Sequence, residues 1–272
     1  MIQGFICPDG TRIDKDDCFK KCRMEEECLT IPTLMAMAYE HPWSGKPSTT
    51  QLLNGPMLNV LKIFKPYYIK PEARVYAITG IRMHSKLEEF AKAADLIAEY
   101  RLDGEITGIL DLLEPDRQNG GGYVLTDNKL WGSFQLSKAI KDGDLDNETL
   151  QLNHYRVKVE QDKKLAELLE QEIKISKMRL EVIVRDGGLK AAQLNGIKDK
   201  FKMIPIERLD DDKVTDWFSK RSDELLEAIE AYKEREALPR LCDARECWNG
   251  RRCKGFCDVA EYCPRGAKKP KW

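Results

Sequence analysis

Two aspartates and a lysine, each next to a strand-like run, are the residues of this chain best suited to chemistry. Asp111 ends the run Gly-Ile-Leu-Asp, and Asp127-Asn128-Lys129 follows the apolar run Tyr-Val-Leu-Thr. Two carboxylates held close together repel each other unless a cation lies between them. Mg²⁺ and Mn²⁺ take oxygen ligands and keep bound waters. The pattern therefore predicts a divalent cation held by Asp111, Asp127 and the backbone carbonyl of Asn128.

Lys129 is predicted to act beside this cation. It lies two residues after Asp127, so both side chains project from the same face of a strand. A bound divalent metal polarises a phosphate and lowers the pKa of a coordinated water. A lysine at that point can orient the water and offset charge on the phosphoryl oxygens. The set predicts hydrolysis of phosphodiester bonds, with Asp111, Asp127 and Lys129 as catalytic residues.

Three further residues extend the candidate site. Gln151 and Tyr155 are four residues apart on an expected helix and therefore share a face. Their amide and phenol groups can steady Lys129 or contact a phosphate. His84 is one of only three histidines and precedes the acidic pair. Its imidazole is expected to be a further ligand of the same cation.

The nine cysteines form two groups with one shared spacing, Cys-x10-Cys-x3-Cys-x5-Cys. The members of the two groups are Cys7, Cys18, Cys22 and Cys28 near the start, and Cys242, Cys253, Cys257 and Cys263 near the end. Cys247 lies outside this spacing. The repetition predicts two related ligand loops. Four thiolates suit tetrahedral zinc or an iron–sulfur cluster, and the spacing does not choose between them.

Two arrangements of the thiol ligands remain open. Each end of the chain could close its own four-cysteine site, or one N-terminal thiolate could join three C-terminal ones across the fold. Free buried cysteines and disulfides are the competing interpretations. Metal is favoured over disulfides because the N-terminus lacks the basic start and long apolar stretch of a secretory signal. For the same reason we expect a cytoplasmic protein.

Alternating helical and strand patterns surround these residues. Helices are expected over residues 31–40, 73–94, 133–140, 146–176 and 210–236. Ser48 and Gln51 fit a capping box that opens another helix, which Pro66 ends. Strands are expected over residues 97–102, 105–114, 123–129, 178–185 and 202–206, with Asp103-Gly104 as a two-residue hairpin turn between the first two.

This order predicts an α/β fold with a mixed central sheet flanked by helices. With 272 residues and no evident linker, we expect one catalytic core at residues 31–238. Cysteine-rich metal-binding segments at residues 1–30 and 239–272 would flank it. The sequence contains no run of eighteen apolar residues, so we expect no membrane span.

The net charge of −1 gives no global attraction to nucleic acid, so a local basic groove would have to supply it. The candidates for such a groove are Lys62, Lys65, Lys70, Arg251, Arg252, Lys268, Lys269 and Lys271.

In their order, the acidic and basic residues resemble the motifs of the PD-(D/E)XK nuclease superfamily, specifically its RecB-like branch. That branch is marked by a helix histidine, a Gly-x-x-Asp strand, an acid-x-Lys strand and a Gln-x-x-x-Tyr helix. The matching residues here are His84, Gly108 to Asp111, Asp127 to Lys129, and Gln151 to Tyr155. The match covers roughly residues 48–185. It implies a restriction-endonuclease-like core and a Mg²⁺- or Mn²⁺-dependent deoxyribonuclease.

The resemblance also bears on the cysteines. Exonucleases of the AddB type and CRISPR-adaptation nucleases carry a 4Fe–4S cluster, in which one cysteine before the core joins three after it. Cys253, Cys257 and Cys263 resemble the later three, and Cys28 or another N-terminal cysteine would be the first. The chain departs from the pattern at Leu53-Asn54-Gly55-Pro56, where the early cysteine is missing, and in having four N-terminal cysteines. Structural zinc is the alternative.

The leading hypothesis is a DNA exonuclease in repair, recombination or phage replication. It would act on single-stranded DNA or DNA ends, with a helicase or recombinase partner. The alternative is a catalytically inactive nucleic-acid-binding or scaffold protein held together by cysteine-bound metal. The intact acids and lysine favour the first hypothesis.

Overall fold

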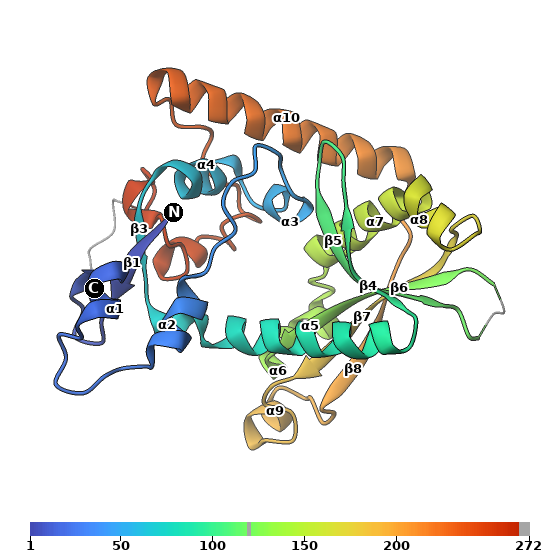
Figure 1. Ribbon diagram of the computed structural model, residues 1–272, viewed down its shortest axis with the longest axis horizontal. Helices are drawn as coiled ribbons and strands as arrows, with labels where there is room; N and C mark the ends of the chain where they lie inside the picture. The colour runs from blue at the N-terminus through green and yellow to red at the C-terminus, as the bar shows by residue number, and fades with distance from the viewer. Residues whose placement is uncertain (119–120, 267–272) are drawn as a thin grey trace. The chain divides into compact units, whose positions relative to one another are not determined.

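The computed structural model describes residues 1–118 and 121–266 (Figure 1). The lysines of the expected basic tail, Lys268, Lys269 and Lys271, lie outside this range. The chain divides into two compact units. Unit 1 contains residues 1–47, 51–78 and 221–272, and unit 2 contains residues 48–50 and 79–220. The expected core, residues 31–238, is thus shared between the two.

Unit 1 contains a small sheet that the sequence patterns did not predict. Its strand order is β2-β1-β3, with β1 at Ile2–Ile6, β2 at Arg12–Asp14 and β3 at Tyr67–Ile69. The central strand β1 pairs antiparallel with β2 and parallel with β3. Because these strands have only three to five residues, they give almost no periodic signal.

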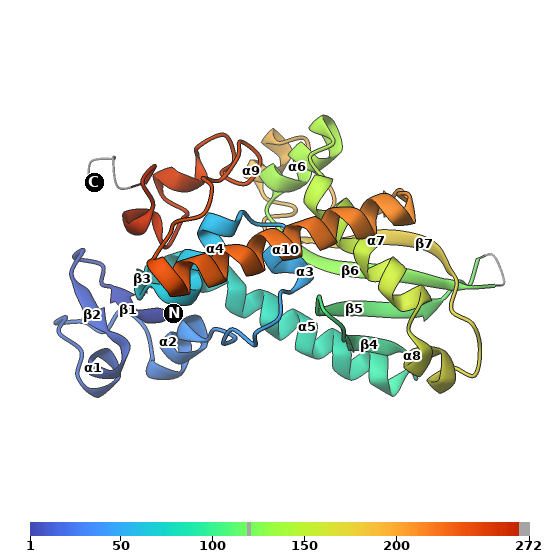
Figure 2. The same cartoon turned by 90° about the horizontal axis from the view of Figure 1, so that it is seen from above.

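All the cysteines belong to unit 1. This unit contains three short helices, α1 (Lys15–Lys20), α2 (Ile31–Ala38) and α4 (Pro56–Phe64). Three 3-10 turns also lie in unit 1, at Pro71–Arg74, Arg252–Lys254 and Ala260–Tyr262. Phe5, Leu61 and Tyr67 form part of its buried core, and the C-terminal segment contributes Val259 to the same cluster. Figure 2 shows α4 close to the red C-terminal segment.

Unit 2 is built on a five-stranded mixed sheet of order β4-β5-β6-β7-β8. The strands are β4 (Ile97–Leu102), β5 (Gly108–Pro115), β6 (Tyr123–Trp131), β7 (Ile175–Val184) and β8 (Phe201–Ile206). Among the strands of this sheet, β6 and β7 pair in parallel and the other neighbours pair antiparallel. A parallel pair needs a long crossover, which here contains α6 (Ser133–Asp142), α7 (Asp146–Glu160) and α8 (Lys163–Leu168). The mixed α/β sheet flanked by helices is confirmed.

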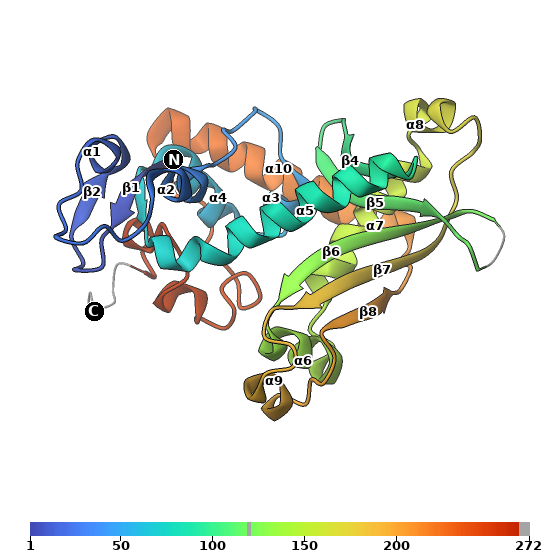
Figure 3. The ribbon, with the colours of Figure 1, turned by 60° about the horizontal axis from the view of Figure 1, so that its bottom comes forward.

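Helices lie on both sides of this sheet. Leu152, Tyr155 and Val159 of α7 join the buried core formed with the sheet strands. In Figure 3, α5 (Val75–Ala93) crosses in front of the sheet and α7 lies behind it. The short helix α9 (Lys190–Leu194) follows β7. The long α10 (Asp211–Arg235) begins in unit 2 and ends in unit 1.

Three predicted elements were wrong in detail. The helix expected after Ser48 is split into α3 (Thr49–Leu52) and α4, because Gly55-Pro56 starts a new helix with proline in its first turn. The helix expected over 146–176 ends at Glu160. Asp162 then caps α8 by accepting a hydrogen bond from the Leu165 N–H, 3.0 Å away. Strand β7 therefore begins at Ile175, earlier than expected.

The hairpin between β4 and β5 is confirmed, but its two-residue turn is wrong. Leu102 pairs with Gly108, so five residues form the loop. The predicted helices near 31–40, 73–94, 133–140 and 210–236 are confirmed within a few residues. Over the described residues, no helix is both long enough and apolar enough to cross a membrane.

Candidate active site

The candidate catalytic residues lie together in unit 2 on adjoining elements. Helix α5 carries His84, β5 carries Asp111, and β6 carries Asp127 and Lys129. The sequence predicted that both aspartates would lie at strand ends. In the structure they lie inside their strands, because β5 and β6 both continue beyond them. The last paired residues of β5 and β6 before the site are Leu112 and Thr126, so Asp111 and Asp127 lie one step beyond them.

One tight group of side chains that could hold a metal ion occurs in the described residues: His84, Glu99 and Asp111. One donor atom from each side chain lies within 4.8 Å of the other two. His84 Nδ1 is 2.9 Å from Glu99 Oε1 and 3.8 Å from Asp111 Oδ2. The contact with Glu99 raises the pKa of His84 above its ordinary value, although burial opposes this. An imidazole with two carboxylates is a set of ligands that suits a divalent cation.

Asp111 is buried between these residues and β6. Its Oδ2 accepts a hydrogen bond of 2.7 Å from the backbone N–H of Asn128. Burial raises the pKa of Asp111 to about 7, and repulsion from Asp127 contributes. Negative charge is therefore crowded at this point, and a bound cation would relieve the crowding.

Asp127 makes different contacts from Asp111. Its Oδ2 lies 2.6 Å from Lys129 Nζ, and the side chain of Asp127 is only 4% exposed. Burial acts to lower the pKa of Lys129, but the charge of Asp127 overcomes this and holds that pKa above its usual value. Glu148 of α7 adds a weaker negative charge near the same lysine. Lys129 is thus a protonated lysine held at a defined place.

Gln151 connects the acidic strand to helix α7. Its Nε2 donates to Asp127 Oδ1 at 3.5 Å and to the Tyr155 hydroxyl at 3.4 Å, both long hydrogen bonds. Burial raises the pKa of Tyr155 to about 12, so the phenol keeps its proton. The four-residue spacing thus places both side chains on one face of α7, as predicted.

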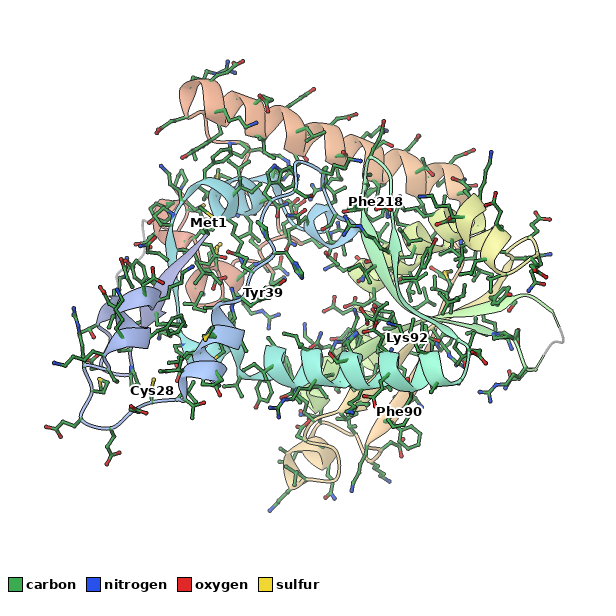
Figure 4. All side chains as sticks on the ribbon, in the orientation of Figure 1. Met1, Cys28, Tyr39, Phe90, Lys92 and Phe218 are labelled. Carbon is green, nitrogen blue, oxygen red and sulfur yellow. The ribbon has the colours of Figure 1, made fainter. Side chains whose placement is uncertain are left out.

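Gly108 allows Tyr155 to reach this position. A Cβ at residue 108 would lie 2.6 Å from the Tyr155 ring and 3.1 Å from Thr49 Oγ1. The glycine of the Gly-x-x-Asp pattern therefore makes room for the ring of the Gln-x-x-x-Tyr pattern. His154, the residue before Tyr155 on α7, instead stacks on Phe218, with ring centroids 4.0 Å apart. Figure 4 labels Phe218.

Glu99 is the residue that sequence reasoning missed. It lies on β4 between Ala98 and Tyr100, which pair with Leu112 and Leu110, so it stands opposite Asp111. Its φ of 49° is in the left-handed region, uncommon for glutamate within a strand. A two-residue turn at Asp103-Gly104 would have placed Glu99 opposite Gly108 instead. Glu99 was therefore missed because the loop was predicted to be too short. The observed pairing of Leu102 with Gly108 places Glu99 opposite Asp111.

The cysteines are all free thiols. In the N-terminal group, burial raises the pKa of Cys18, and repulsion from Cys7, Cys28 and Cys22 adds to the effect. These four thiols therefore lie near one another. Figure 4 labels Cys28, which is exposed, in the N-terminal segment.

The C-terminal thiols also neighbour one another. Burial raises the pKa of Cys242 to about 11, and Glu246, Cys257 and Cys263 contribute repulsion. Within residues 1–118 and 121–266, no three thiols approach one another as closely as the donors of the His84 group. Sulfurs around one zinc ion would be about 3.8 Å apart, since Zn–S bonds are about 2.3 Å long.

Known proteins give little guidance for this chain. Neither a protein-family model nor a curated protein matches the sequence. The chain is similar to a solved structure described as the crystal structure of SSO0001, with 18% identity and a TM-score of 0.44. That similarity covers 88% of this chain and 94% of the other.

Proposed function

We propose that this protein is a metal-dependent DNA nuclease of the PD-(D/E)XK type, whose restriction-endonuclease-like core is the five-stranded sheet of unit 2. One observation carries the proposal: a histidine, three carboxylates and a protonated lysine gather at the centre of that sheet from α5, β4, β5 and β6. Buried charges of this kind are costly unless they bind something. A divalent cation and a phosphate complement them.

His84, Glu99 and Asp111 would hold Mg²⁺ or Mn²⁺, with Asp127 and the Asn128 carbonyl as the further ligands expected from sequence. The donor set fits, because it supplies one nitrogen and several carboxylate oxygens. The cation would supply Lewis acidity to a phosphate oxygen and lower the pKa of a coordinated water.

The remaining side chains position the reactants. Lys129, held by Asp127, places a positive charge where the phosphoryl oxygens would gain negative charge. Gln151 links Asp127 to Tyr155 and so fixes the carboxylate that holds the lysine. The buried Tyr155 anchors this chain of contacts in the core.

The resemblance to RecB-like nucleases supports DNA as substrate and exonucleolytic cleavage of single strands or ends. It also supports roles in repair, recombination or phage replication beside a helicase or recombinase. Two of the sequence-based candidates for a basic groove have partners within the chain: Lys62 pairs with Asp258, and Arg252 donates to Asn54. Metal bound by the cysteine groups, as an iron–sulfur cluster or zinc, completes the proposal.

The test is cleavage of end-labelled linear single-stranded DNA with Mn²⁺. We expect wild type to degrade the strand, and Asp127→Ala and Lys129→Ala to lose at least about 100-fold in rate. Lys202→Ala is the matched control, because Lys202 is an exposed lysine on β8 of the same sheet. It should cleave at the wild-type rate.

Equal rates in wild type and Lys129→Ala would exclude the proposed role of the lysine. DNA binding by wild type without any cleavage would instead favour the inactive nucleic-acid-binding protein as the function. Testing a 5′-blocked and a 3′-blocked strand in the same assay reports the polarity of an exonuclease. Cleavage of a circular strand would show endonuclease activity instead.

A further inference from the structure

The C-terminal cysteines surround one cavity in unit 1. The pocket is lined by all five of them: Cys242, Cys247, Cys253, Cys257 and Cys263. Apolar side chains of α4 and Val259 complete much of its wall. In residues 1–118 and 121–266, no three sulfurs lie within 4.8 Å of one another, a wider spacing than the roughly 3.8 Å expected around one zinc ion. A polynuclear cluster binds each thiolate at a separate iron and suits sulfurs that are farther apart.

Cys242 reaches the start of helix α4, although it is far away in the sequence. Gly55 is the N-cap residue of that helix, and a Cβ at Gly55 would lie 3.1 Å from Cys242 Sγ. The backbone N–H of Leu58, in the first turn, donates to the Cys242 sulfur. First-turn N–H groups lack partners within the helix, and they favour negative charge. Cys242 therefore places its sulfur where a side chain at residue 55 would begin.

A buried ionic group holds the Cys242 loop in this position. Glu246 is 3% exposed and accepts two hydrogen bonds of 2.9 Å from the Arg240 guanidinium. The Glu246 carboxylate also accepts the N–H of Asp243, the residue that follows Cys242. Its Oε2 would lie 2.5 Å from a Cβ at Gly55, so the loop packs directly on the helix start. None of these contacts with Glu246 involves an N-terminal cysteine.

Cys247 differs from the other four in the partners of its sulfur. Its Sγ donates to the Ala244 carbonyl at 3.8 Å and accepts from Arg265 Nη1 at 3.4 Å. Arg252 also lines the cavity. The two guanidinium groups can offset the negative charge of a thiolate-bound cluster. The pocket therefore offers four thiols besides Cys247, whose sulfur an arginine already contacts.

We propose that the C-terminal segment alone supplies the four thiolates of an iron–sulfur cluster, Cys242, Cys253, Cys257 and Cys263, with Cys242 in the place of an N-terminal ligand. Cys7, Cys18, Cys22 and Cys28 then form a second, separate metal site. The identical spacing of the two groups is consistent with two self-contained sites. This inference rests on the proposed binding of metal by the cysteines, but it is independent of DNA cleavage.

The test compares full-length wild type with Cys242→Ser, Cys28→Ser and Cys247→Ser after anaerobic purification. Iron, sulfide and zinc are measured per chain, and dithionite-reduced samples are examined by EPR. We expect Cys242→Ser to lose most of its iron and sulfide, or to keep them with a changed EPR spectrum because serine has become a ligand. Cys28→Ser should keep the wild-type cluster signal and lose the metal of the N-terminal site. Cys247→Ser, the buried matched control, should keep both.

A second variant guards against simple misfolding. Gly55→Ala leaves every thiol in place but puts a methyl group against Cys242 Sγ. It should release iron to a chelator several times faster than wild type, whereas Gly80→Ala, at a helical glycine with nothing within 4 Å, should not. Loss of the cluster signal in Cys28→Ser, with full retention in Cys242→Ser, would overturn the proposal. Zinc without iron or sulfide in wild type would overturn the cluster. Because no DNA is used, failure of the nuclease proposal would be seen separately.

Discussion

The acidic site of unit 2 and the cysteine groups of unit 1 are organised by the chain in different ways. The acidic site is carried on strands and helices, and hydrogen bonds of the protein already hold its members together, such as Asn128 N–H to Asp111. Most of the cysteines lie in loops and 3-10 turns, and their sulfurs are farther apart. Regular elements can pre-organise a metal site, whereas loop-borne ligands depend on the metal to bring them together.

Removal of the metal that we propose for the cysteines should therefore have the largest effect, and it should be confined to unit 1. A mercurial reagent with a chelator would strip metal from the thiols. We expect amide exchange protection to fall by more than about 100-fold in residues 1–30 and 242–266. Protection in β6 should stay within a few-fold of its starting value. EDTA without the mercurial is the control. Equal loss of protection in β6 would break the comparison.

Glu99→Gln tests whether Glu99 is a metal ligand of the acidic site. Glu99 contacts His84 and lies opposite Asp111, so loss of its charge should weaken Mn²⁺ binding by about 10- to 100-fold. Titration of Mn²⁺ followed by EPR measures this affinity. Glu114→Gln on β5 is the matched control, because Glu114 pairs with Arg179. If both variants bind Mn²⁺ like wild type, Glu99 has no part in the metal site.

Sequence reasoning succeeded where spacing acts through a regular element. Two residues along a strand placed Lys129 beside Asp127, and four along a helix placed Tyr155 beside Gln151. It failed where a loop decides the geometry. The five-residue loop after β4 moved Glu99 opposite Asp111, and no local pattern specifies a loop of that length.

The same limit explains the cysteines. Equal spacing identified two groups of four thiols, but spacing does not report which group another segment approaches. The packing of Cys242 on Gly55 depends on Glu246 and Arg240, which contact each other only in the folded chain. The sheet of unit 1 was missed for a related reason, because β1 and β3 are short and come from distant parts of the sequence.

Gly108→Ala asks whether the acidic site depends on close packing. The new methyl group would meet the buried Tyr155 ring, so we expect a loss of about 1–3 kcal/mol in the free energy of unfolding. Displacement of Tyr155 should also slow cleavage through Gln151. Gly80→Ala on α5 is the matched control. It has open space around it and should be neutral or stabilise by up to about 1 kcal/mol. Chemical denaturation measures both, and equal behaviour of the two variants would argue against a packed site.

The smallest expected effect is a loss of stability of unit 2 in acid. We expect this loss to come from a buried histidine of unit 2 and not from the thiols of unit 1. His154 is buried against Phe218, and its Nδ1 lies 2.9 Å from Thr49 Oγ1. Burial lowers the pKa of His154 to about 3, from an ordinary value of 6.5. Because the unfolded chain binds the proton first, stability is lost as pH falls below about 6.5. At pH 5.5 the loss from this residue should be about 1.4 kcal/mol.

His154→Gln removes this titration but keeps a polar side chain of moderate size. At pH 8, where the histidine is neutral in both folded and unfolded chains, wild type should be the more stable protein, because glutamine lacks the stacking on Phe218. Between pH 8 and pH 5.5 the variant should regain about 1.4 kcal/mol relative to wild type. Urea denaturation at the two pH values, monitored in β6 by amide exchange, measures the change. A constant difference between the proteins would mean that His154 does not govern the acid response of unit 2.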